Sequence, residues 1–252
     1  MKDISEERIL VTGASRGIGL AIARHMLAKG AHLVLHYHST AESVESLQNE
    51  YGRDKVAIVR ANLEQAEQTA KMFVEASEYF GGLDTVVINA GVFEPCSIDT
   101  AWEKWFKSWQ RTIRVNLDSA GILTRLCLGH FRKKNQGRLI YIGSRAAIRG
   151  ETQEYLAYAA SKGGLTSLAK SVARSFGRYN IKSFVIAPGF TRTDMAMEAI
   201  ANIGEEQVLE NLALNELTTP EDIAPLVSFI ASGQMDHATG TTIDLNAGSH
   251  IR

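Results

Sequence analysis

The chain of 252 residues has little of what marks disulfide-rich, zinc-binding and multidomain proteins. It contains two cysteines, Cys96 and Cys127, and they do not form a Cys-x-x-Cys pair, so neither a disulfide framework nor a cysteine zinc site is indicated. The four prolines are scattered, and the sequence has no internal repeat, low-complexity segment or Pro/Gly-rich linker. These absences favour one domain over residues 1–252.

The sequence also lacks an excess of charge of either sign and any long apolar run. Lys and Arg number 27 and Asp and Glu 28, which leaves no broad electrostatic surface for nucleic acid or an anionic membrane. No segment approaches the roughly 18 apolar residues of a membrane span, and residues 1–8 contain no apolar signal core. We therefore expect a cytoplasmic protein that binds a small molecule and binds neither nucleic acid nor a membrane.

Short apolar runs alternate with helical patterns along the whole chain. Strands are expected at residues 8–12, 32–38, 56–60, 85–89, 138–142, 181–187 and 241–246, and helices at 18–28, 42–51, 67–80, 102–133, 155–179 and 220–232. This order predicts an α/β fold, a Rossmann-like doubly wound parallel sheet of about seven strands with helices on both faces. Ligands of such sheets bind at the carboxyl ends of the strands, so the turns after the first, fourth, fifth and sixth strands are the candidate sites.

Residues 10–19 read Leu-Val-Thr-Gly-Ala-Ser-Arg-Gly-Ile-Gly, a strand that runs through a glycine-rich turn into a helix. Gly13 permits a tight turn, Gly17 permits close approach of a pyrophosphate, and Gly19 permits close packing of the helix on the sheet. The helix N-terminus would attract the phosphates. The spacing Thr-Gly-x-x-x-Gly-x-Gly differs from the commoner Gly-x-Gly-x-x-Gly fingerprint, and by itself it also fits a simple turn.

Tyr158 and Lys162 stand four residues apart, which places both side chains on one face of the helix expected at 155–179. A phenol has a pKa of about 10, and a neighbouring cation lowers that pKa. Tyr158 would then donate and accept protons near neutral pH. Without further motifs the same spacing also describes an ordinary exposed Tyr/Lys pair on a helix.

Further motifs occur in a fixed order along the chain, and with them the sequence resembles the short-chain dehydrogenase/reductase family. They are Thr-Gly-Ala-Ser-Arg-Gly-Ile-Gly at 12–19, Asn-Ala-Gly at 89–91, Asn116, Ser144, Tyr158 with Lys162, and Pro188-Gly189 with Thr193. The match runs over residues 8–246 and is similar to the bacterial 3-oxoacyl-[acyl-carrier-protein] reductases. Sugar, steroid and other alcohol dehydrogenases share these motifs.

The resemblance implies hydride transfer between a nicotinamide cofactor and a carbonyl or secondary alcohol. Tyr158 would protonate the carbonyl oxygen and Ser144 would hold it. Lys162 would lower the pKa of Tyr158 and bind the ribose, and Asn116 would position a water molecule linked to Lys162. From the residues alone, Ser144 also fits a strand-end turn and Asn116 a buried amide that satisfies the backbone.

The resemblance also implies a set of residues that contact the cofactor. They are Gly13, Ser15, Arg16, Gly17, Ile18, Gly19, His38, Asn62, Leu63, Asn89, Ala90, Gly91, Tyr158, Lys162, Pro188, Gly189, Thr191 and Thr193.

NADP is expected rather than NAD, because the second strand ends in His-Tyr-His-Ser at 36–39 without the acid that would bind a 2′-hydroxyl and repel a 2′-phosphate. Arg16 matches the basic position of NADP-using relatives, although it also fits a solvated surface arginine. His36 and His38 share one face of the strand without further ligand spacing, so no metal site is predicted.

Two positions, Asn62 and Gly129, depart from the family pattern. Asn62 stands where many relatives have an aspartate beside the adenine. Arg178 matches a basic residue of the carrier-protein reductases, whereas Gly129 stands where another basic residue is expected. A substrate carried on acyl-carrier protein or coenzyme A therefore stays one alternative among carbonyl and alcohol substrates.

The resemblance also implies that the segment 191–215 forms a substrate loop or lid, and that residues 93–96 and 146–155 form further walls of the substrate pocket. The small residues of the two long helices indicate a homo-oligomer, a dimer or tetramer. The alternative of another class is a non-catalytic dinucleotide sensor, which would be expected to have lost Tyr158 or Lys162.

Overall fold

The fold is built on a seven-stranded sheet in which every neighbouring pair is parallel. The computed structural model describes residues 3–251, without the side chains of 198–199 and 201–203. Its strands are β1 (Arg8–Val11), β2 (His32–Tyr37), β3 (Val56–Arg60), β4 (Thr85–Ile88), β5 (Gly137–Ile142), β6 (Ile181–Pro188) and β7 (Thr242–Leu245). Their order is β3-β2-β1-β4-β5-β6-β7, which confirms the doubly wound sheet.

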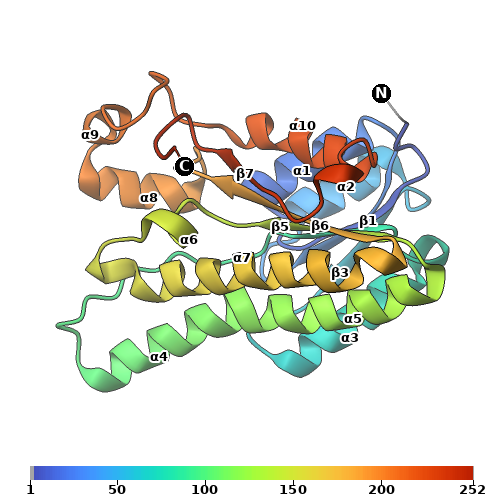
Figure 1. The fold of residues 1–252 in the computed structure, drawn as a ribbon, viewed down its shortest axis with the longest axis horizontal. Coiled ribbons are helices and arrows are strands. Elements are labelled where there is room, and N and C mark those ends of the chain that lie inside the picture. Colours follow the sequence, from blue (N-terminus) through green and yellow to red (C-terminus); the bar gives the residue numbers. More distant parts are fainter. Residues whose placement is uncertain (1–2, 252) are drawn as a thin grey trace.

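Helices cover both faces of the sheet (Figure 1). One face carries α1 (Gly17–Leu27), α2 (Glu42–Tyr51) and α10 (Pro220–Ala231), and the other carries α3 (Ala66–Glu78), α5 (Ser119–Lys134) and α7 (Leu156–Phe176). Side chains alternate along a strand, so Ile9 and Val11 of β1 join the first apolar core and Leu10 joins the second. Burial on both faces explains why the strands are short apolar runs.

The long helix expected at 102–133 is divided in the structure. It consists of α4 (Trp102–Ile113), a π-helical turn (Arg114–Asp118) and α5. A π-helical turn contains about one residue more than an α-helical turn, and this changes which side chains face inward. Such turns often occur at functional sites. In this turn Asn116 is buried.

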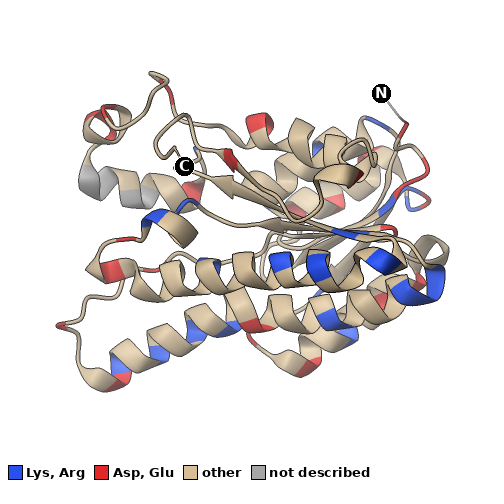
Figure 2. Cartoon of the chain, in the orientation of Figure 1, with Lys and Arg blue, Asp and Glu red and all other residues tan. Residues whose placement is uncertain are grey.

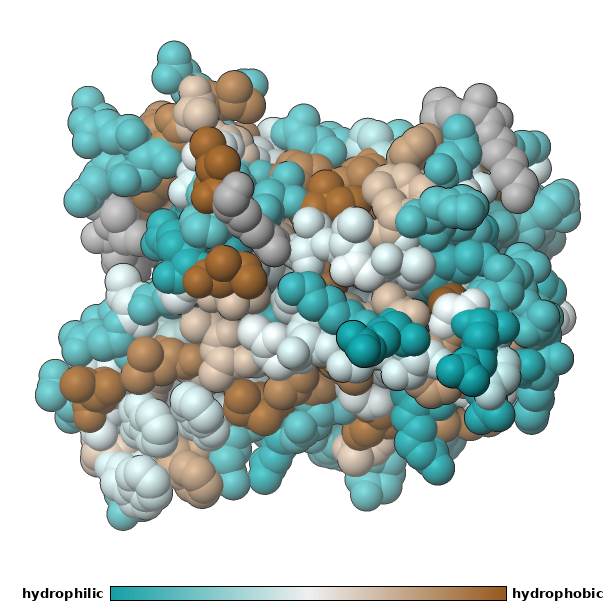
Figure 3. All heavy atoms as spheres, viewed as in Figure 1, coloured by the Kyte–Doolittle hydropathy of each residue, from teal (hydrophilic) through white to brown (hydrophobic). Residues whose placement is uncertain are grey.

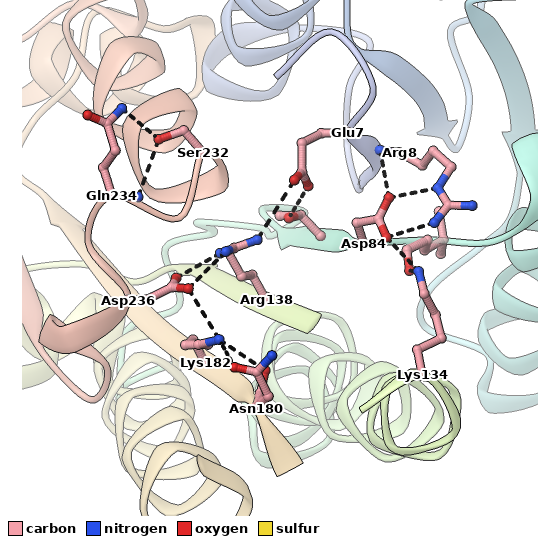
Figure 4. A network of polar contacts seen from close by, with 12 residues as sticks. Glu7, Arg8, Asp84, Lys134, Arg138, Asn180, Lys182, Ser232, Gln234 and Asp236 are labelled. Carbon is pink, nitrogen blue, oxygen red and sulfur yellow. Dashed lines mark hydrogen bonds and ion pairs between the residues drawn. The ribbon is translucent and has the colours of Figure 1, made fainter. Parts of the chain in front are cut away.

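The amino-terminal edge of the sheet carries a network of ion pairs (Figure 4). Asp84 pairs with Arg8 at 2.7 Å and with Lys134 at 2.5 Å, and Asp236 pairs with Arg138 at 2.8 Å. Burial raises the pKa of Asp84, but the hydrogen bonds from Arg8 and Lys134 outweigh it and hold that pKa at about 2. This edge is stabilised by charges that neutralise one another.

The carboxyl-terminal edge is covered by α6 (Ala146–Arg149), α8 (Asp194–Ile203) and α9 (Glu205–Leu209). The segment expected to be a lid thus contains two helices, and a small apolar cluster of Ile200, Val208 and Leu217 packs beneath them. None of the helices described between residues 3 and 251 is long and apolar enough to cross a membrane.

Candidate active site

A cavity of about 440 Å³ opens at the carboxyl ends of β1, β4, β5 and β6. Of the residues predicted to act in catalysis or cofactor binding, all but Gly19 and Asn116 line it. The predicted site residues, which lie in turns more than a hundred positions apart in the sequence, therefore meet in one place. Among the side chains that the structure describes, no three His, Cys, Asp or Glu residues are grouped as a metal site would require.

The glycine turn at the start of α1 has the space and backbone angles that only glycine provides. Gly13 and Gly17 have φ values of 66° and 53°. A Cβ on Gly19 would stand 2.2 Å from the carbonyl oxygen of Gly13. The first turn of α1 contains no acid, and its leading amides have no carbonyl partner within the helix. This cradle fits a pyrophosphate.

Side chains from neighbouring strands hold the turn in place. The Asn89 Nδ2 donates to the carbonyl oxygens of Thr12 at 2.8 Å and Gly13 at 3.2 Å. The Thr12 hydroxyl in turn accepts from the amides of Asn89 and Ala90. Asn89 therefore acts on the turn itself, at the point where β1 separates from β4.

His36 supports the same turn from β2. The Gly13 amide donates to His36 Nδ1 at 3.1 Å, so the proton of the imidazole is on Nε2, which donates to the carbonyl oxygen of Ala61 at 3.1 Å. Burial lowers the pKa of His36 to about 4. This histidine is a neutral structural group, and both of its ring nitrogens bond to the backbone.

The end of β2 is open to solvent, and no carboxylate follows it. Arg16, His38 and Ser39 are exposed there and line the cavity. The Arg60 Nε donates to the carbonyl oxygen of His38 at 3.1 Å, and so brings a second cation near this end of the cavity. Arg60 was not among the predicted site residues. Its position at the end of β3, opposite Tyr37, was the one feature of the sequence that could have indicated it. Asn62 lines the cavity nearby and accepts from the Glu64 amide at 3.0 Å.

The loop after β6 closes the other side of the cavity. Pro188, Gly189, Thr191 and Thr193 all line it. Thr193 caps α8, where its hydroxyl accepts from the Ala196 amide at 3.3 Å. Its Cγ2 would lie 3.2 Å from a Cβ on Gly17, so the start of the lid packs directly against the glycine turn.

Tyr158 lies in the first turns of α7, where its ring packs edge-on against Phe93 at 4.6 Å between centroids. Burial raises the pKa of Tyr158 to about 12, although a hydrogen bond with Ser144 and the charge of Arg145 act in the opposite direction. This direction is opposite to the lowering expected from Lys162. The phenol of the protein by itself is therefore fully protonated at neutral pH.

Lys162 is buried one turn further along α7. Its Nζ donates to the carbonyl oxygen of Ile142 at 2.8 Å and lies 5.7 Å from the centroid of the Tyr158 ring. Burial lowers the pKa of Lys162 to about 8. The ammonium thus faces the cavity between the carboxyl end of β5 and the amino-terminal part of α7. Its charge is poorly solvated there.

Asn116 lies behind this pair, in the π-helical turn. Its Oδ1 accepts from the Val92 amide at 2.8 Å, and its Nδ2 donates to the Val92 carbonyl at 2.9 Å and to the Ser161 hydroxyl at 3.2 Å. Every polar atom of this amide is used within the protein. The contacts agree with the alternative in which Asn116 forms hydrogen bonds with buried backbone groups. They also hold the segment that follows β4 beside Lys162.

Ser144 lies at the carboxyl end of β5, where its Oγ accepts from the Ala146 amide at 3.1 Å. The cavity wall beside it includes Glu151, from the wall expected at 146–155, Phe190, from the candidate turn after β6, and Arg145, which was not among the predicted residues. No local pattern marks Arg145, because its place depends on the loops after β5 and β6 meeting. A hydroxyl and a protonated phenol beside a nucleotide-shaped cradle can together bind and protonate a carbonyl oxygen.

Known proteins are similar to this chain over nearly its full length. The family model described as Enoyl-(Acyl carrier protein) reductase matches residues 13–250. The 3-oxoacyl-[acyl-carrier-protein] reductase FabG of Vibrio cholerae is 32% identical over 242 residues, 96% of each chain. Nodulation protein G of a Rhizobium species is 31% identical over 249 residues, 98% of each chain. A solved structure, gox2181, has a TM-score of 0.88 at 22% identity, covers 97% of this chain and 95% of its own, and shows the fold alone.

Proposed function

The chain belongs to the short-chain dehydrogenase/reductase family of oxidoreductases, which use NAD(P), and we propose that it is an NADP(H)-dependent reductase of carbonyl compounds. The observation that carries this proposal is the single cavity that joins the glycine turn to Ser144, Tyr158 and Lys162. A dinucleotide sensor has no need of the last three residues, and their meeting in one cavity favours turnover.

The residues present fit a nicotinamide dinucleotide. The glycine turn offers amides to the pyrophosphate, and Lys162 reaches the cavity where the ribose hydroxyls would lie. When bound, the cofactor supplies or accepts the hydride. Arg16 and the absence of an acid after β2 favour a 2′-phosphate, and hence NADP over NAD.

The protein itself supplies the proton and its placement. Burial keeps Tyr158 protonated at neutral pH, so the phenol is ready to donate to a carbonyl oxygen held by Ser144. The ammonium of Lys162 stabilises the phenolate left after donation.

The substrate class follows in part from the relatives. Several of them are named 3-oxoacyl-[acyl-carrier-protein] reductases, and reduction of a 3-oxoacyl thioester is the finer form of this proposal. One observation argues against a carrier protein as partner. Arg178 lies in the turn after α7, twenty residues and about 30 Å beyond Tyr158, and does not line the cavity of the same chain. A sugar, steroid or other alcohol substrate is the second candidate.

We extend the proposal to the organisation of the chain, as one nucleotide-binding domain over residues 1–252 with a lid over 191–215. The packing of Thr193 against Gly17 supports the lid, because it links lid position to the phosphate cradle. Met195 and Ala196 of α8 line the substrate side of the cavity.

Consumption of NADPH with a panel of carbonyl compounds tests the proposed activity, with Tyr158→Phe as the decisive variant. This change keeps the ring and its contact with Phe93 but removes the proton. Turnover should fall by roughly 10²–10⁴ while NADPH still binds. Near wild-type turnover in a variant with an unchanged circular dichroism spectrum would refute the role of Tyr158.

Lys162→Met should lower turnover and also raise the KM for NADPH, because it removes both a charge near the phenol and a ribose contact. The double variant should lose little more than the worse single variant, since the two residues act on one proton transfer.

A further inference from the structure

Arg145 follows Ser144 directly, and its guanidinium is buried in the wall of the cavity. The residue is 4% exposed, and its Nη1 has no hydrogen-bond partner among the described residues. The guanidinium carbon lies 4.9 Å from the centroid of the Phe190 ring. Phe190 thus covers one face of the planar group and leaves the nitrogens at its edge to the cavity.

A guanidinium is always charged in proteins, and burying such a charge without a partner is costly. None of the side chains that the structure describes forms an ion pair with Arg145. The carboxylate of Glu151, which also lines the cavity, pairs with Arg149 at 3.9 Å. Arg145 therefore carries a positive charge inside the cavity to which no described carboxylate bonds directly, and Glu151 acts on this charge only through space.

The backbone holds Arg145 in this place. Its amide donates to the Pro188 carbonyl oxygen at 3.0 Å, and its carbonyl accepts from the amides of Ile148 and Arg149. The loops after β5 and β6 thus fix the guanidinium on the side of the cavity that holds Ser144 and Tyr158. The glycine turn, which takes the phosphates, follows a different strand, β1.

We propose that Arg145 determines substrate specificity by binding a carboxylate on the carbonyl compound that Ser144 and Tyr158 engage. The planar guanidinium can form two parallel hydrogen bonds to one carboxylate. Because Phe190 covers one face of the guanidinium, the carboxylate would bind at the free edge. The substrates are accordingly oxo acids rather than 3-oxoacyl thioesters, which have no free carboxylate for Arg145 to bind. This inference rests on the proposed reductase function and adds the acid group to it.

Matched pairs of an acid and its methyl ester test the inference, because the two differ only in charge at the carboxyl group. The probes are 2-oxobutanoate, 3-oxobutanoate, 2-oxooctanoate and 3-oxooctanoate, each with its ester, reduced with NADPH by the wild type and by Arg145→Gln. For the preferred acid, kcat/KM should fall by about tenfold to a hundredfold in Arg145→Gln, the range of one charge-assisted pair. The ester should change less than about twofold.

Two further variants separate this effect from general charge and from misfolding. Arg174→Gln removes the same charge from an exposed position on α7 and should leave both substrates unaffected. Arg145→Lys keeps a cation and should recover part of the preference for the acid, but not all of it, because an ammonium cannot pair in the bidentate way.

Binding of the acids is measured in parallel by calorimetry. A wild type that reduces the esters as well as or better than the acids, or an Arg145→Gln variant that binds and reduces the acids normally, overturns the inference and leaves the reductase function intact. A wild type that reduces nothing overturns the reductase function. In that case the binding data decide on Arg145: loss of acid binding in Arg145→Gln supports its assignment, and unchanged acid binding overturns it.

Discussion

His36 illustrates how one side chain can support a binding turn without touching a ligand. It accepts from the Gly13 amide and donates to the Ala61 carbonyl, a pattern that only the neutral imidazole can make. Protonation would place a second N–H against the Gly13 amide, inside a buried site. Burial lowers the pKa of His36 to about 4, although the hydrogen bond to the Ala61 carbonyl acts in the opposite direction.

The lowered pKa of His36 predicts a loss of stability in mild acid. The unfolded chain binds a proton near its ordinary pKa of 6.5 and the folded protein near 4, so the contribution is fully present above pH 6.5 and is lost as the pH falls toward 4. Between pH 7 and pH 5 the free energy of unfolding should fall by about 2 kcal/mol from this group.

Urea unfolding at the two pH values measures the change. The difference should shrink by about that amount in His36→Gln, whereas His237→Gln, at an exposed histidine, should retain the wild-type difference. An unchanged difference in His36→Gln would mean that His36 titrates alike in the folded and unfolded chain.

Arg16 is the residue on which the proposed choice of NADP depends. It precedes α1, is exposed, and lines the cavity near the end of β2. Arg16→Ala should weaken binding of NADPH by about 1.5–3 kcal/mol, as expected for a charge-assisted bond to phosphate, and leave binding of NADH unchanged. Fluorescence titration with both nucleotides measures this, and equal losses for the two would exclude a 2′-phosphate contact.

At the scale of elements, the packing of α1 on the sheet depends on the absence of a side chain at Gly19. A Cβ there would stand 2.2 Å from the Gly13 carbonyl oxygen and 2.6 Å from the Asn89 Nδ2. Backbone cannot yield as a flexible side chain does, so the helix itself would have to move. Because the turn and the helix share these contacts, stability and nucleotide binding are coupled in this element.

Gly19→Ala should therefore destabilise the protein by about 1–3 kcal/mol through overpacking, and lower its affinity for NADPH. Gly129→Ala is the control, because that glycine lies within α5 with nothing within 4 Å of the added Cβ. There the stability should rise by up to about 1 kcal/mol, from helix propensity alone. Thermal unfolding with and without NADPH measures both effects, and a Gly19→Ala protein as stable as the wild type would contradict the coupling.

At the scale of the molecule, charge is spread over the surface, with Lys and Arg along α4, α5 and α7 and acids on α2, α3, α9 and α10 (Figure 2). Apolar side chains are exposed among the helices on the left of the same view (Figure 3). On α4, Trp102 and Phe106 are 65% and 39% exposed, and the Trp102 ring stacks on Trp105 and on Phe106. A row of stacked aromatic rings on an outer helix is typical of a surface that another protein covers.

We expect this row to lie in an interface between copies of the chain, within a dimer or tetramer. Light scattering at micromolar concentration should give a multiple of 27.6 kDa, and Trp102→Glu should shift the mass toward the monomer. Val74→Glu, at a 53% exposed apolar residue of α3, should leave the assembly unchanged. A wild-type monomer would contradict the expectation.

Most of the fold was predictable, because the information lies within a few neighbouring residues. The expected strands all occur, and the helix at 42–51 and the strand at 56–60 have the expected bounds. The division of the helix expected at 102–133 was not predictable, because a π-helical turn is stabilised by what its buried residue contacts. Asn116 finds that contact in Val92, more than twenty residues earlier.

The sequence by itself determined the elements and the chemistry carried by local spacing: the glycine turn, and a phenol and an amine one helical turn apart. Tertiary structure alone decided which segments contact one another and how far they are buried from solvent. His36 beneath the glycine turn, and Arg145 against Phe190, join parts of the chain that no short pattern connects. Burial also reversed the expected pKa shift of Tyr158, because the cost of an ionised phenol depends on all the atoms that exclude water from it.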